Sequence, residues 1–295
     1  MRDYDQYISG KSDAVRFPGM TPIGTSQHLF PFQAAIVEWA LRKGRAANFS
    51  DTGLGKTIMQ VEWARQVAAD GRVLMLAPLA VADQTSREAA RFGVDIPYCR
   101  EDIGARICIT NYEMVDQFDP DEFVGIVLDE SSILKNFNGR TRNGLIRSFS
   151  DTPYRFACTA TPAPNDFTEL GNHSEFLGAL SRVEMLAEYF VHDGGSTKDW
   201  RLKGHAVRSF WQWVCTWGVV VRTPGDLGFD SGAFSLPSLH IHQERIPVNH
   251  ADAHERGMLF KPDARTLNEQ RRVRKETIGQ RVEIAARIAA DNPGR

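Results

Sequence analysis

The sequence has little cysteine, no long apolar run and no recognisable leader segment. Its four cysteines are scattered and form no CxxC pair: Cys99, Cys108, Cys158 and Cys215. Isolated cysteines of this kind are typical of reduced thiols in a cytoplasmic protein. No apolar stretch approaches the roughly 18 to 20 residues that cross a membrane, and the polar beginning MRDYDQYISGK does not resemble a signal peptide. We therefore expect a cytoplasmic protein with no membrane partner.

The chain also lacks a strong excess of either charge. It carries 35 lysine and arginine residues against 37 aspartate and glutamate residues, which gives a formal net charge of −2. Overall charge therefore does not indicate a nucleic-acid-binding protein, although a nearly neutral protein can still carry a basic groove. A hydrophobic content of 42% is enough for a packed core, and 295 residues allow about two domains.

Apolar strands alternate with helical patterns over residues 29–178, after an irregular lead-in at residues 1–28. The spacing of apolar residues predicts helices at 32–43, 56–69 and 81–92. Short apolar runs predict strands at 46–49, 72–78, 106–110, 124–130 and 155–161. Strands that are apolar throughout and separated by helices predict an α/β fold, with a parallel sheet flanked by helices on both faces.

The alternation fades after residue 178, where we expect a mostly helical, loop-rich extension. Residues 179–262 are rich first in aromatic residues and then in loop-forming residues, and residues 263–295 are polar, arginine-rich and strongly helical. The helical spacing of Phe210, Val214 and Trp217 favours a small core over a base-stacking surface. Basic residues of this extension are candidates for contacts with a nucleic-acid backbone: Lys198, Arg201, Lys203 and Arg208.

The stretch SDTGLGKT, residues 50–57, has the features of a phosphate-binding loop. It follows a predicted strand and opens a predicted helix, and it contains Gly53, Gly55, Lys56 and Thr57. A glycine-rich turn exposes backbone N–H groups, and a helix N-terminus adds partial positive charge. Lys56 adds a full charge for phosphates, and Thr57 adds a hydroxyl for Mg²⁺. Ser50 stands where the consensus has its first glycine, and an ordinary flexible turn is the alternative.

Two further strand ends carry polar residues. The buried strand GIVLDE ends in the adjacent carboxylates Asp129 and Glu130. Ligands bind open parallel sheets at the carboxyl ends of their strands, where an Asp can hold Mg²⁺ and a Glu can activate water. A solvated strand end is the alternative interpretation. Thr159 and Thr161 alternate at the end of the next strand, and in isolation they indicate only a turn.

In order and spacing, six strings resemble the first motor lobe of a superfamily-two helicase, in particular the Swi/Snf-type translocases of double-stranded DNA. They are LFPFQAAIVEWAL (29–41), SDTGLGKT (50–57), LAPLAVADQTSREAARF (76–92), ICITNYEMV (107–115), VLDESSILKN (127–136) and CTATPAPNDFTELGNHSEFL (158–177). The resemblance implies a RecA-like lobe of the P-loop NTPase class at residues 29–178, with ATP and Mg²⁺ as cofactors and DNA, more often duplex than single-stranded, as a partner.

The resemblance also implies a role for individual residues. By this resemblance Gln33 recognises adenine, and the rest of the ATP site consists of Thr52, Gly53, Leu54, Gly55, Lys56 and Thr57. The catalytic residues are Lys56, Asp129 and Glu130, and Mg²⁺ is bound by Thr57 and Asp129. The residues that couple the nucleotide to DNA are Ser132, Thr159 and Thr161. The residues that contact DNA are Pro78, Leu79, Thr110, Asn111, Lys135 and Asn136.

The chain departs from the family pattern in two respects. The family usually has Ala-His after Asp-Glu, whereas this chain has Ser131 and Ser132, and we expect Ser132 to form the hydrogen bond to the threonine motif. The family also needs a second lobe of on the order of 150 residues. Residues 179–262 instead resemble the segment between the lobes, and residues 263–295 the approach to the second one. We therefore expect a second RecA-like lobe beyond Arg295.

The sequence thus predicts a helicase-like ATPase that couples ATP hydrolysis to movement on duplex DNA, of a phage or a bacterium. One alternative is a module that binds ATP and DNA but hydrolyses little alone. Another is the motor part of a restriction or defence complex with a nuclease or methylase partner. A small-molecule kinase fits less well. Four histidines are clustered in the sequence: His240, His242, His250 and His254. Such histidines are more often ordinary surface residues, and a metal site is the minor alternative.

Overall fold

The computed structural model describes residues 18–135, 139–192, 200–234, 241, 243–246 and 266–291. The chain divides into two compact units, Met1–Ser235 and Leu236–Arg295. Some residues singled out in the sequence lie outside the described residues. They are the predicted DNA-contact residue Asn136, the basic residue Lys198 and all four clustered histidines, His240, His242, His250 and His254.

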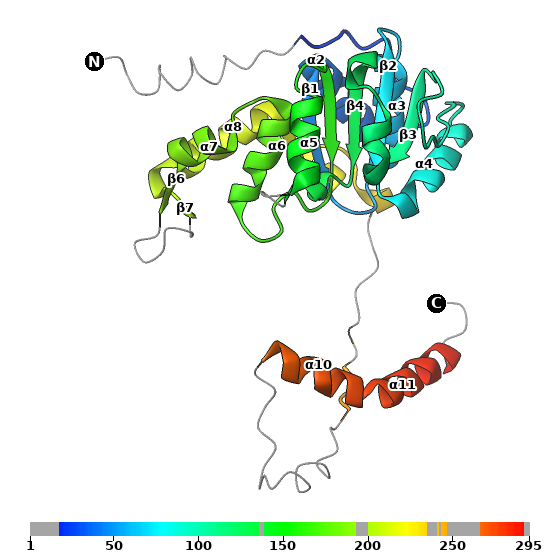
Figure 1. Ribbon diagram of the computed structural model, residues 1–295, viewed down its shortest axis with the longest axis vertical. Coiled ribbons are helices and arrows are strands. Elements are labelled where there is room, and N and C mark those ends of the chain that lie inside the picture. Colours follow the sequence, from blue (N-terminus) through cyan, green and yellow to red (C-terminus); the bar gives the residue numbers. More distant parts are fainter. Residues whose placement is uncertain are drawn as a thin grey trace, which may run out of the picture. The chain divides into compact units, whose positions relative to one another are not determined.

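The first unit is built on a six-stranded sheet in which all the strands are parallel (Figure 1). The strand order is β3-β2-β4-β5-β1-β8. The strands are β1 (Arg45–Ser50), β2 (Arg72–Ala77), β3 (Ile107–Asn111), β4 (Phe123–Asp129), β5 (Tyr154–Cys158) and β8 (Gly218–Val221). Parallel strands need crossover connections, and the helices between them supply these.

Helices cover both faces of the sheet, so the unit has three layers. One face carries α2 (Pro31–Lys43), α3 (Lys56–Val67) and α4 (Leu79–Arg91). The opposite core is formed by α5 (Arg140–Ser148), α6 (Leu170–Leu177), α7 (Arg182–Tyr189) and α8 (Val207–Trp217). The connections contain 3-10 helices: η1 (Tyr112–Gln117), η2 (Pro120–Glu122), η3 (Ser131–Lys135), η4 (Phe167–Glu169), η5 (Gly204–Ala206), η6 (Pro224–Leu227) and η7 (Gly232–Phe234).

The two cores arise from the alternation of side chains along each strand. On β2, Val73 and Met75 join the core under α2 and α3, whereas Leu74 and Leu76 join the core on the other face. All four side chains are fully buried. Strands that bury both faces are expected to be continuously apolar, which is why the sequence indicated them. The predicted α/β fold with a parallel sheet is therefore confirmed.

The predicted helical extension after residue 178 is present, and it also contributes a strand that the sequence did not indicate. β8 follows α8 directly and pairs with β1 from Ala47↔Gly218 to Ser50↔Val221. The aromatic residues of α8 are core residues, since Phe210, Trp213 and Trp217 are all buried. A small antiparallel pair, β6 (Phe190–His192) and β7 (Trp200–Leu202), lies between α7 and α8 in the chain.

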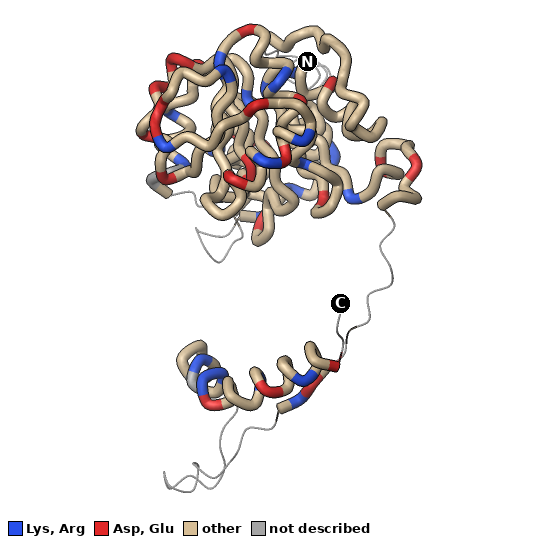
Figure 2. Tube along the Cα trace, turned by 90° about the vertical axis from the view of Figure 1, so that its right-hand side faces the viewer, with Lys and Arg blue, Asp and Glu red and all other residues tan. Residues whose placement is uncertain are grey.

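The second unit contains α10 (Leu267–Glu276) and α11 (Ile278–Asp291). Lysine and arginine recur along both helices in Figure 2, and none of the described side chains of α11 is buried. Both observations fit a solvated helical surface. Among the described residues, no helix is both long enough and apolar enough to cross a membrane.

The pairing of β8 predicts different effects on stability for two neighbouring valines. Val221 is 1% exposed, whereas Val220 is 53% exposed. Val221→Ala should lower the free energy of unfolding by about 1–3 kcal/mol, because it removes buried methyl groups and leaves a cavity. Val220→Ala should change it by less than about 0.5 kcal/mol. Chemical denaturation of both variants measures the difference, and equal effects would contradict the register of β8.

Candidate functional site

The glycine-rich turn (residues 51–55) joins the end of β1 to the start of α3. Gly53 and Gly55 have φ angles of 85° and 76°, a left-handed region that residues with a Cβ enter only at a cost. Gly55 is the N-cap of α3, and Thr52 in this turn is exposed. The turn therefore places the first backbone N–H groups of α3 at its open end, where an anion can bind.

Lys56, the first residue of α3, points back across this turn. Its Nζ donates hydrogen bonds to the backbone oxygens of Ser50, at 2.9 Å, and Asp51, at 3.1 Å. The ammonium group is therefore held between the end of β1 and the helix N-terminus. This position combines a full positive charge with the partial charge of the helix end.

Gln33, on α2, lies beneath the glycine-rich turn. Its Nε2 donates to the backbone oxygen of Leu54 at 2.9 Å, and its Oε1 accepts from the N–H of Phe30 at 2.9 Å. A Cβ at Gly55 would lie 2.4 Å from the same Nε2. Gln33 is 3% exposed, so both ends of its amide are used within the lobe. In this arrangement Gln33 supports the turn, and its predicted contact with adenine stays a prediction.

Asp129 ends β4 and lies on the Lys56 side of the sheet. Its Oδ1 accepts hydrogen bonds from Gln60 Nε2, at 2.8 Å, and from the N–H of Glu130, at 3.1 Å. Burial raises the pKa of the Asp129 carboxyl, and these hydrogen bonds and the charge of Lys56 oppose the shift. A buried carboxylate needs nearby positive charge, which makes this group a suitable partner for a cation.

The donor set at this position fits Mg²⁺. Mg²⁺ prefers oxygen ligands and is commonly held by one or two protein oxygens together with phosphates. Asp129 offers a carboxylate whose two described hydrogen bonds both go to Oδ1. Thr57, a half-buried residue in the first turn of α3, offers a hydroxyl. Among the described residues, no cluster of three or more His, Cys, Asp or Glu side chains offers a protein-only metal site.

Glu130 is held in an unusual backbone conformation. Its φ angle is 52°, which makes it the one residue other than glycine with positive φ in the described part of the chain. Thr159 Oγ1 donates to Glu130 Oε1 at 2.8 Å, and Thr159 Oγ1 in turn accepts from the N–H of Thr161 at 3.0 Å. A strained residue held by its surroundings is typical of functional sites. The predicted residues Glu130, Thr159 and Thr161 thus lie in one hydrogen-bonded chain.

Ser131, rather than Ser132, forms a side-chain hydrogen bond, and its partner lies on α6 rather than in the threonine motif. Ser131 Oγ lies 3.0 Å from Nε2 of His173 on α6, and both residues are fully buried. Ser132 is half-buried, and no hydrogen bond of its side chain is recorded among the described residues. The first residue of η3 therefore turns inward and the second does not.

Three side chains at the site were not predicted from the sequence. Gln60 binds Asp129, His173 binds Ser131, and the Tyr112 hydroxyl donates to the backbone oxygen of Asp129 at 2.6 Å. Gln60 lies one helical turn after Lys56, and this spacing could have indicated it. Tyr112 and His173 depend on contacts between distant segments, for which the sequence carries no local signal.

The predicted DNA-contact residues differ in exposure. Pro78 is the N-cap of α4, and Leu79 after it is 63% exposed. Lys135, at the end of η3, is also exposed. These residues are available to a partner at the surface, and their contact with DNA stays a prediction.

The side chains of Thr110 and Asn111 do not reach the surface. Thr110 is fully buried, and Asn111 is 3% exposed. Asn111 Oδ1 caps η1 by accepting from the N–H groups of Glu113 and Met114, both at 3.1 Å. The side-chain positions therefore do not support the predicted contact of Thr110 and Asn111 with DNA.

The candidate Lys203 is hydrogen-bonded within the chain, since its Nζ donates to the backbone oxygens of Ala187 and Glu188.

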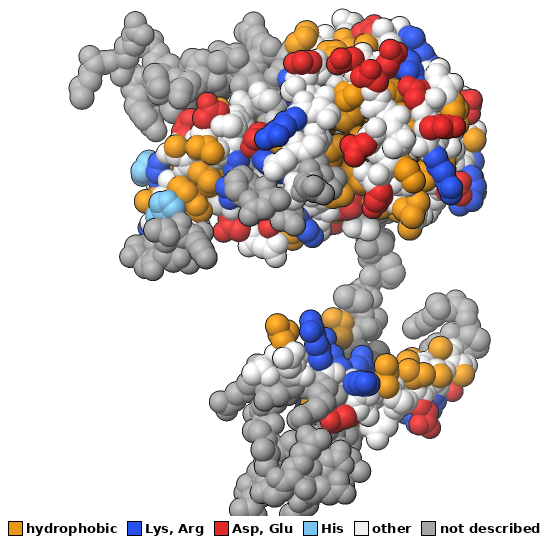
Figure 3. Space-filling view, viewed as in Figure 1, with side chains coloured by type: hydrophobic (Ala, Val, Ile, Leu, Met, Phe, Trp, Pro, Cys, Tyr) orange, Lys and Arg blue, Asp and Glu red, His pale blue; other side chains and the backbone are white. Residues whose placement is uncertain are grey.

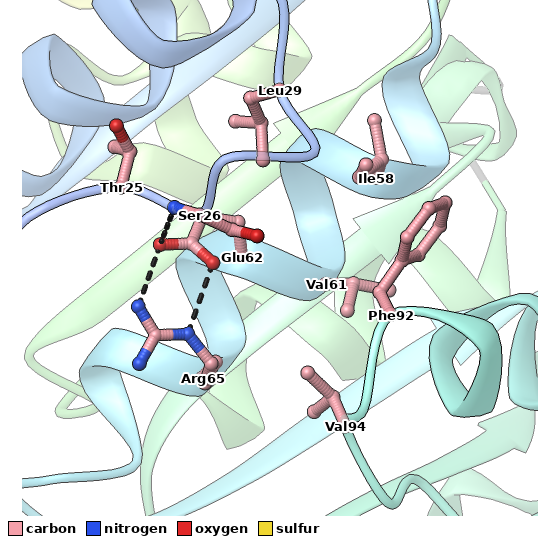
Figure 4. A pocket seen from close by; sticks show the side chains of 9 residues that line it. All are labelled: Thr25, Ser26, Leu29, Ile58, Val61, Glu62, Arg65, Phe92 and Val94. Carbon is pink, nitrogen blue, oxygen red and sulfur yellow. Dashed lines mark hydrogen bonds and ion pairs between the residues drawn. The ribbon is translucent and has the colours of Figure 1, made fainter.

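A cavity of about 220 Å³ opens beside the outer face of α3 (Figure 4). Ile58, Val61 and Phe92 contribute apolar surface to it. Glu62 and Arg65 contribute charge, and Arg65 Nη2 lies 2.8 Å from Glu62 Oε1. The cavity therefore combines apolar walls with one ion pair, along the segment of α3 from Ile58 to Arg65.

Figure 3 shows both acidic and basic side chains interspersed on one face of the first unit. This distribution agrees with the formal net charge of −2. A DNA-binding surface on this face would depend on individual basic side chains rather than on a continuous positive area.

The buried histidine predicts how stability changes with pH. Burial lowers the pKa of His173 from 6.5 to about 4. Between these values the unfolded chain binds a proton that the folded chain does not, so stability is lost as the pH falls through this window. We expect the wild type to lose about 3 kcal/mol more than the His173→Gln variant between pH 6.5 and pH 4. Denaturation of both proteins across this range measures the difference, and parallel curves would contradict it.

Comparison with known proteins gives similarity in structure alone. No protein-family model matches the chain, and no curated protein matches it. The fold is similar to the Sulfolobus solfataricus SWI2/SNF2 ATPase core in complex with dsDNA, with a TM-score of 0.56 and 18% identity over 69% of this chain and 46% of that chain. It is also similar to the SWI2/SNF2 ATPase core domain of the same organism, with a TM-score of 0.54 and 20% identity over 76% of this chain and 50% of that chain.

The similarity covers only part of each SWI2/SNF2 structure. The chain spans about half the length of the two SWI2/SNF2 structures, at 46% and 50%. Identities of 18% and 20% carry the fold and not the activity. The predicted resemblance is therefore confirmed at the level of fold: the chain has the RecA-like architecture that the two SWI2/SNF2 ATPase cores share.

Proposed function

We propose that this chain is the ATP-hydrolysing lobe of a translocase that moves on double-stranded DNA. The observation that carries the proposal is that Lys56, which follows β1, lies near Asp129 and Glu130 at the end of β4, where β1 and β4 flank β5 and run parallel to it. Such strand ends are where open α/β sheets bind their ligands. A lysine at a helix N-terminus beside two carboxylates is suited to a magnesium–nucleoside triphosphate.

In the proposed mechanism the glycine-rich turn and Lys56 bind the phosphates. The N–H groups at the start of α3 donate to phosphate oxygens, and Lys56 offsets their negative charge. Asp129 and Thr57 would hold Mg²⁺. When bound, Mg²⁺ neutralises charge on the phosphates.

Glu130 is the proposed base. It accepts a proton from water as the water oxygen forms a bond to the γ-phosphorus. The bond from the γ-phosphorus to the bridging oxygen breaks, and ADP and phosphate are the products. Thr159 donates to one oxygen of the Glu130 carboxylate, at 2.8 Å, and so fixes its direction.

The cavity beside α3 is the proposed site of the nucleotide base. Base pockets need apolar walls and a few polar groups that fix orientation. Ile58 and Phe92 provide such walls, and the ion pair of Glu62 and Arg65 provides the polar groups. Gln33 would support this site through the glycine-rich turn, because its amide holds Leu54.

Duplex DNA is the proposed track. One similar structure is described as a SWI2/SNF2 ATPase core in complex with dsDNA. In this chain Leu79 and Lys135 are exposed on the segments that follow β2 and β4, so both are available to a backbone passing the strand ends. A second RecA-like lobe would complete the motor.

A second candidate function rests on the share of the similar structures that this chain covers. Because it spans about half of the SWI2/SNF2 cores, it could act as a module that binds ATP and DNA and hydrolyses ATP only with a partner. The two candidates differ in whether the chain alone turns over ATP.

The first test is ATP hydrolysis by the chain with and without duplex DNA, with Lys56→Ala as the blank. The variant should lose on the order of 10²-fold in nucleotide affinity or turnover, because one full charge on the phosphates is removed. DNA-stimulated turnover above the blank supports the translocase lobe. ATP binding that depends on Lys56, without turnover, favours the module. Unchanged ATP affinity in the variant would contradict the proposal that Lys56 binds the phosphates.

The role of Glu130 predicts a separate result. Glu130→Gln keeps the size of the side chain and removes its basicity, so nucleotide affinity should remain within about threefold while turnover falls by on the order of 10²- to 10⁴-fold. Fluorescent-nucleotide titration and phosphate release measure the two quantities. Undiminished turnover would remove Glu130 as the base.

A further inference from the structure

We propose that His173 is a positioning residue that links helix α6 to the catalytic segment through its hydrogen bond with Ser131. This inference rests on the proposed function, because it concerns the base Glu130. It assigns a coupling role to a residue on α6, outside the threonine motif and outside the position at which the sequence led us to expect the link.

The contact is short, buried and local to the site. Ser131 Oγ and His173 Nε2 are 3.0 Å apart, and both residues are 0% exposed. Water therefore does not compete for either group, and a buried hydroxyl and imidazole left without each other would be unfavourable. Ser131 is the residue that directly follows Glu130.

Glu130 needs such an anchor because its backbone is strained. A φ of 52° is unfavourable for a residue with a Cβ, so the surrounding structure must hold it. On one side, Tyr112 donates to the backbone oxygen of Asp129. On the other side, His173 holds Ser131. The peptide that carries the proposed base is therefore fixed from both ends.

His173 also contacts the strand that leads into the glycine-rich turn. The ring of Phe49 on β1 packs edge-to-face against the imidazole, with centroids 5.2 Å apart and an interplanar angle of 87°. This packing fixes the plane of the imidazole. One side chain thus lies between the segment that precedes the turn and the segment that contains Glu130.

Helix α6 joins this side chain to the rest of the helical layer. Asn172 Nδ2 donates to the backbone oxygen of Lys135 at 3.2 Å, at the far end of η3. Glu175 pairs with Arg142 of α5, at 2.6 Å, and accepts from the N–H of Arg182 at the start of α7, at 3.1 Å. A displacement of α5 or α7 would therefore reach Ser131, and through it Glu130, by way of α6.

The test is a double-mutant cycle of Ser131→Ala and His173→Leu, with kcat and KM for ATP measured with and without duplex DNA. Each single variant should lower the DNA-stimulated kcat by on the order of tenfold and leave KM within about twofold. The double variant should be no worse than the single ones, because both remove the same hydrogen bond. His173→Gln, whose amide can occupy the position of Nε2, should restore most of the rate.

Ser174→Ala is the matched control on the same helix. Ser174 is equally buried and binds the backbone of Leu180, and no contact with Ser131 is recorded for it. Its DNA-stimulated kcat should remain within about twofold of the wild type. A thermal melt of each variant checks folding, and Ser131→Ala with His173→Gln carries the test if His173→Leu does not fold.

Additive effects of Ser131→Ala and His173→Leu would overturn the inference, as would an equal loss in the control. Absence of turnover in the wild type would instead count against the proposed hydrolysis. The cycle is then repeated on the affinity for a fluorescent ATP analogue with and without duplex DNA. A DNA-dependent affinity that both variants lose supports the link, and an affinity that DNA leaves unchanged in the wild type overturns it.

Discussion

The site depends on the parallel register of three neighbouring strands. Cys158, the last residue of β5, pairs with Asn48 of β1 on one side and with Asp129 of β4 on the other. Because parallel strands end at the same edge, this register brings the start of the glycine-rich turn and the two carboxylates together from distant parts of the sequence. The glycine-rich turn and the two carboxylates form the site only together, and β5 separates them because it is the strand between β1 and β4.

Burial then determines the chemistry at this edge. The Asp129 carboxyl lies deep enough for its pKa to rise, and the charge of Lys56 opposes that shift. Gln60 donates to the same carboxyl and so directs it. The fold thus places a carboxylate where it needs positive charge and arranges an ammonium group nearby, which is the condition a magnesium–nucleotide complex would meet.

The sequence predicted the elements whose signal is local. Continuous apolar runs identified β2 and β4, and the glycine, lysine and threonine of residues 53–57 identified the start of α3. Features that depend on distant contacts were missed. β8 is only four residues long and pairs with a strand from the other end of the lobe, and the hydrogen bond of His173 required knowledge of how α6 lies against η3.

The same limit applies to the DNA-contact candidates. Thr110 and Asn111 were predicted from their place in the sequence, yet both side chains are buried, and Asn111 accepts from the N–H groups at the start of η1. Asn111 is used as a cap for η1, a local role that its position after a strand permits but does not require. Residue type and order identified the segment, and only packing decided which of its atoms reach the surface.

The position of β8 has a consequence for how the lobe is made on the ribosome. β1 emerges early but obtains its two neighbours late, since Asn48 pairs with Cys158 and with Val219. Until residue 221 has left the exit tunnel, one edge of β1 has no partner, and the strand before the glycine-rich turn is exposed to non-native pairing. The edge of the sheet at which the glycine-rich turn begins is therefore among the last to be completed, although β1 is the first strand of this sheet to be synthesised.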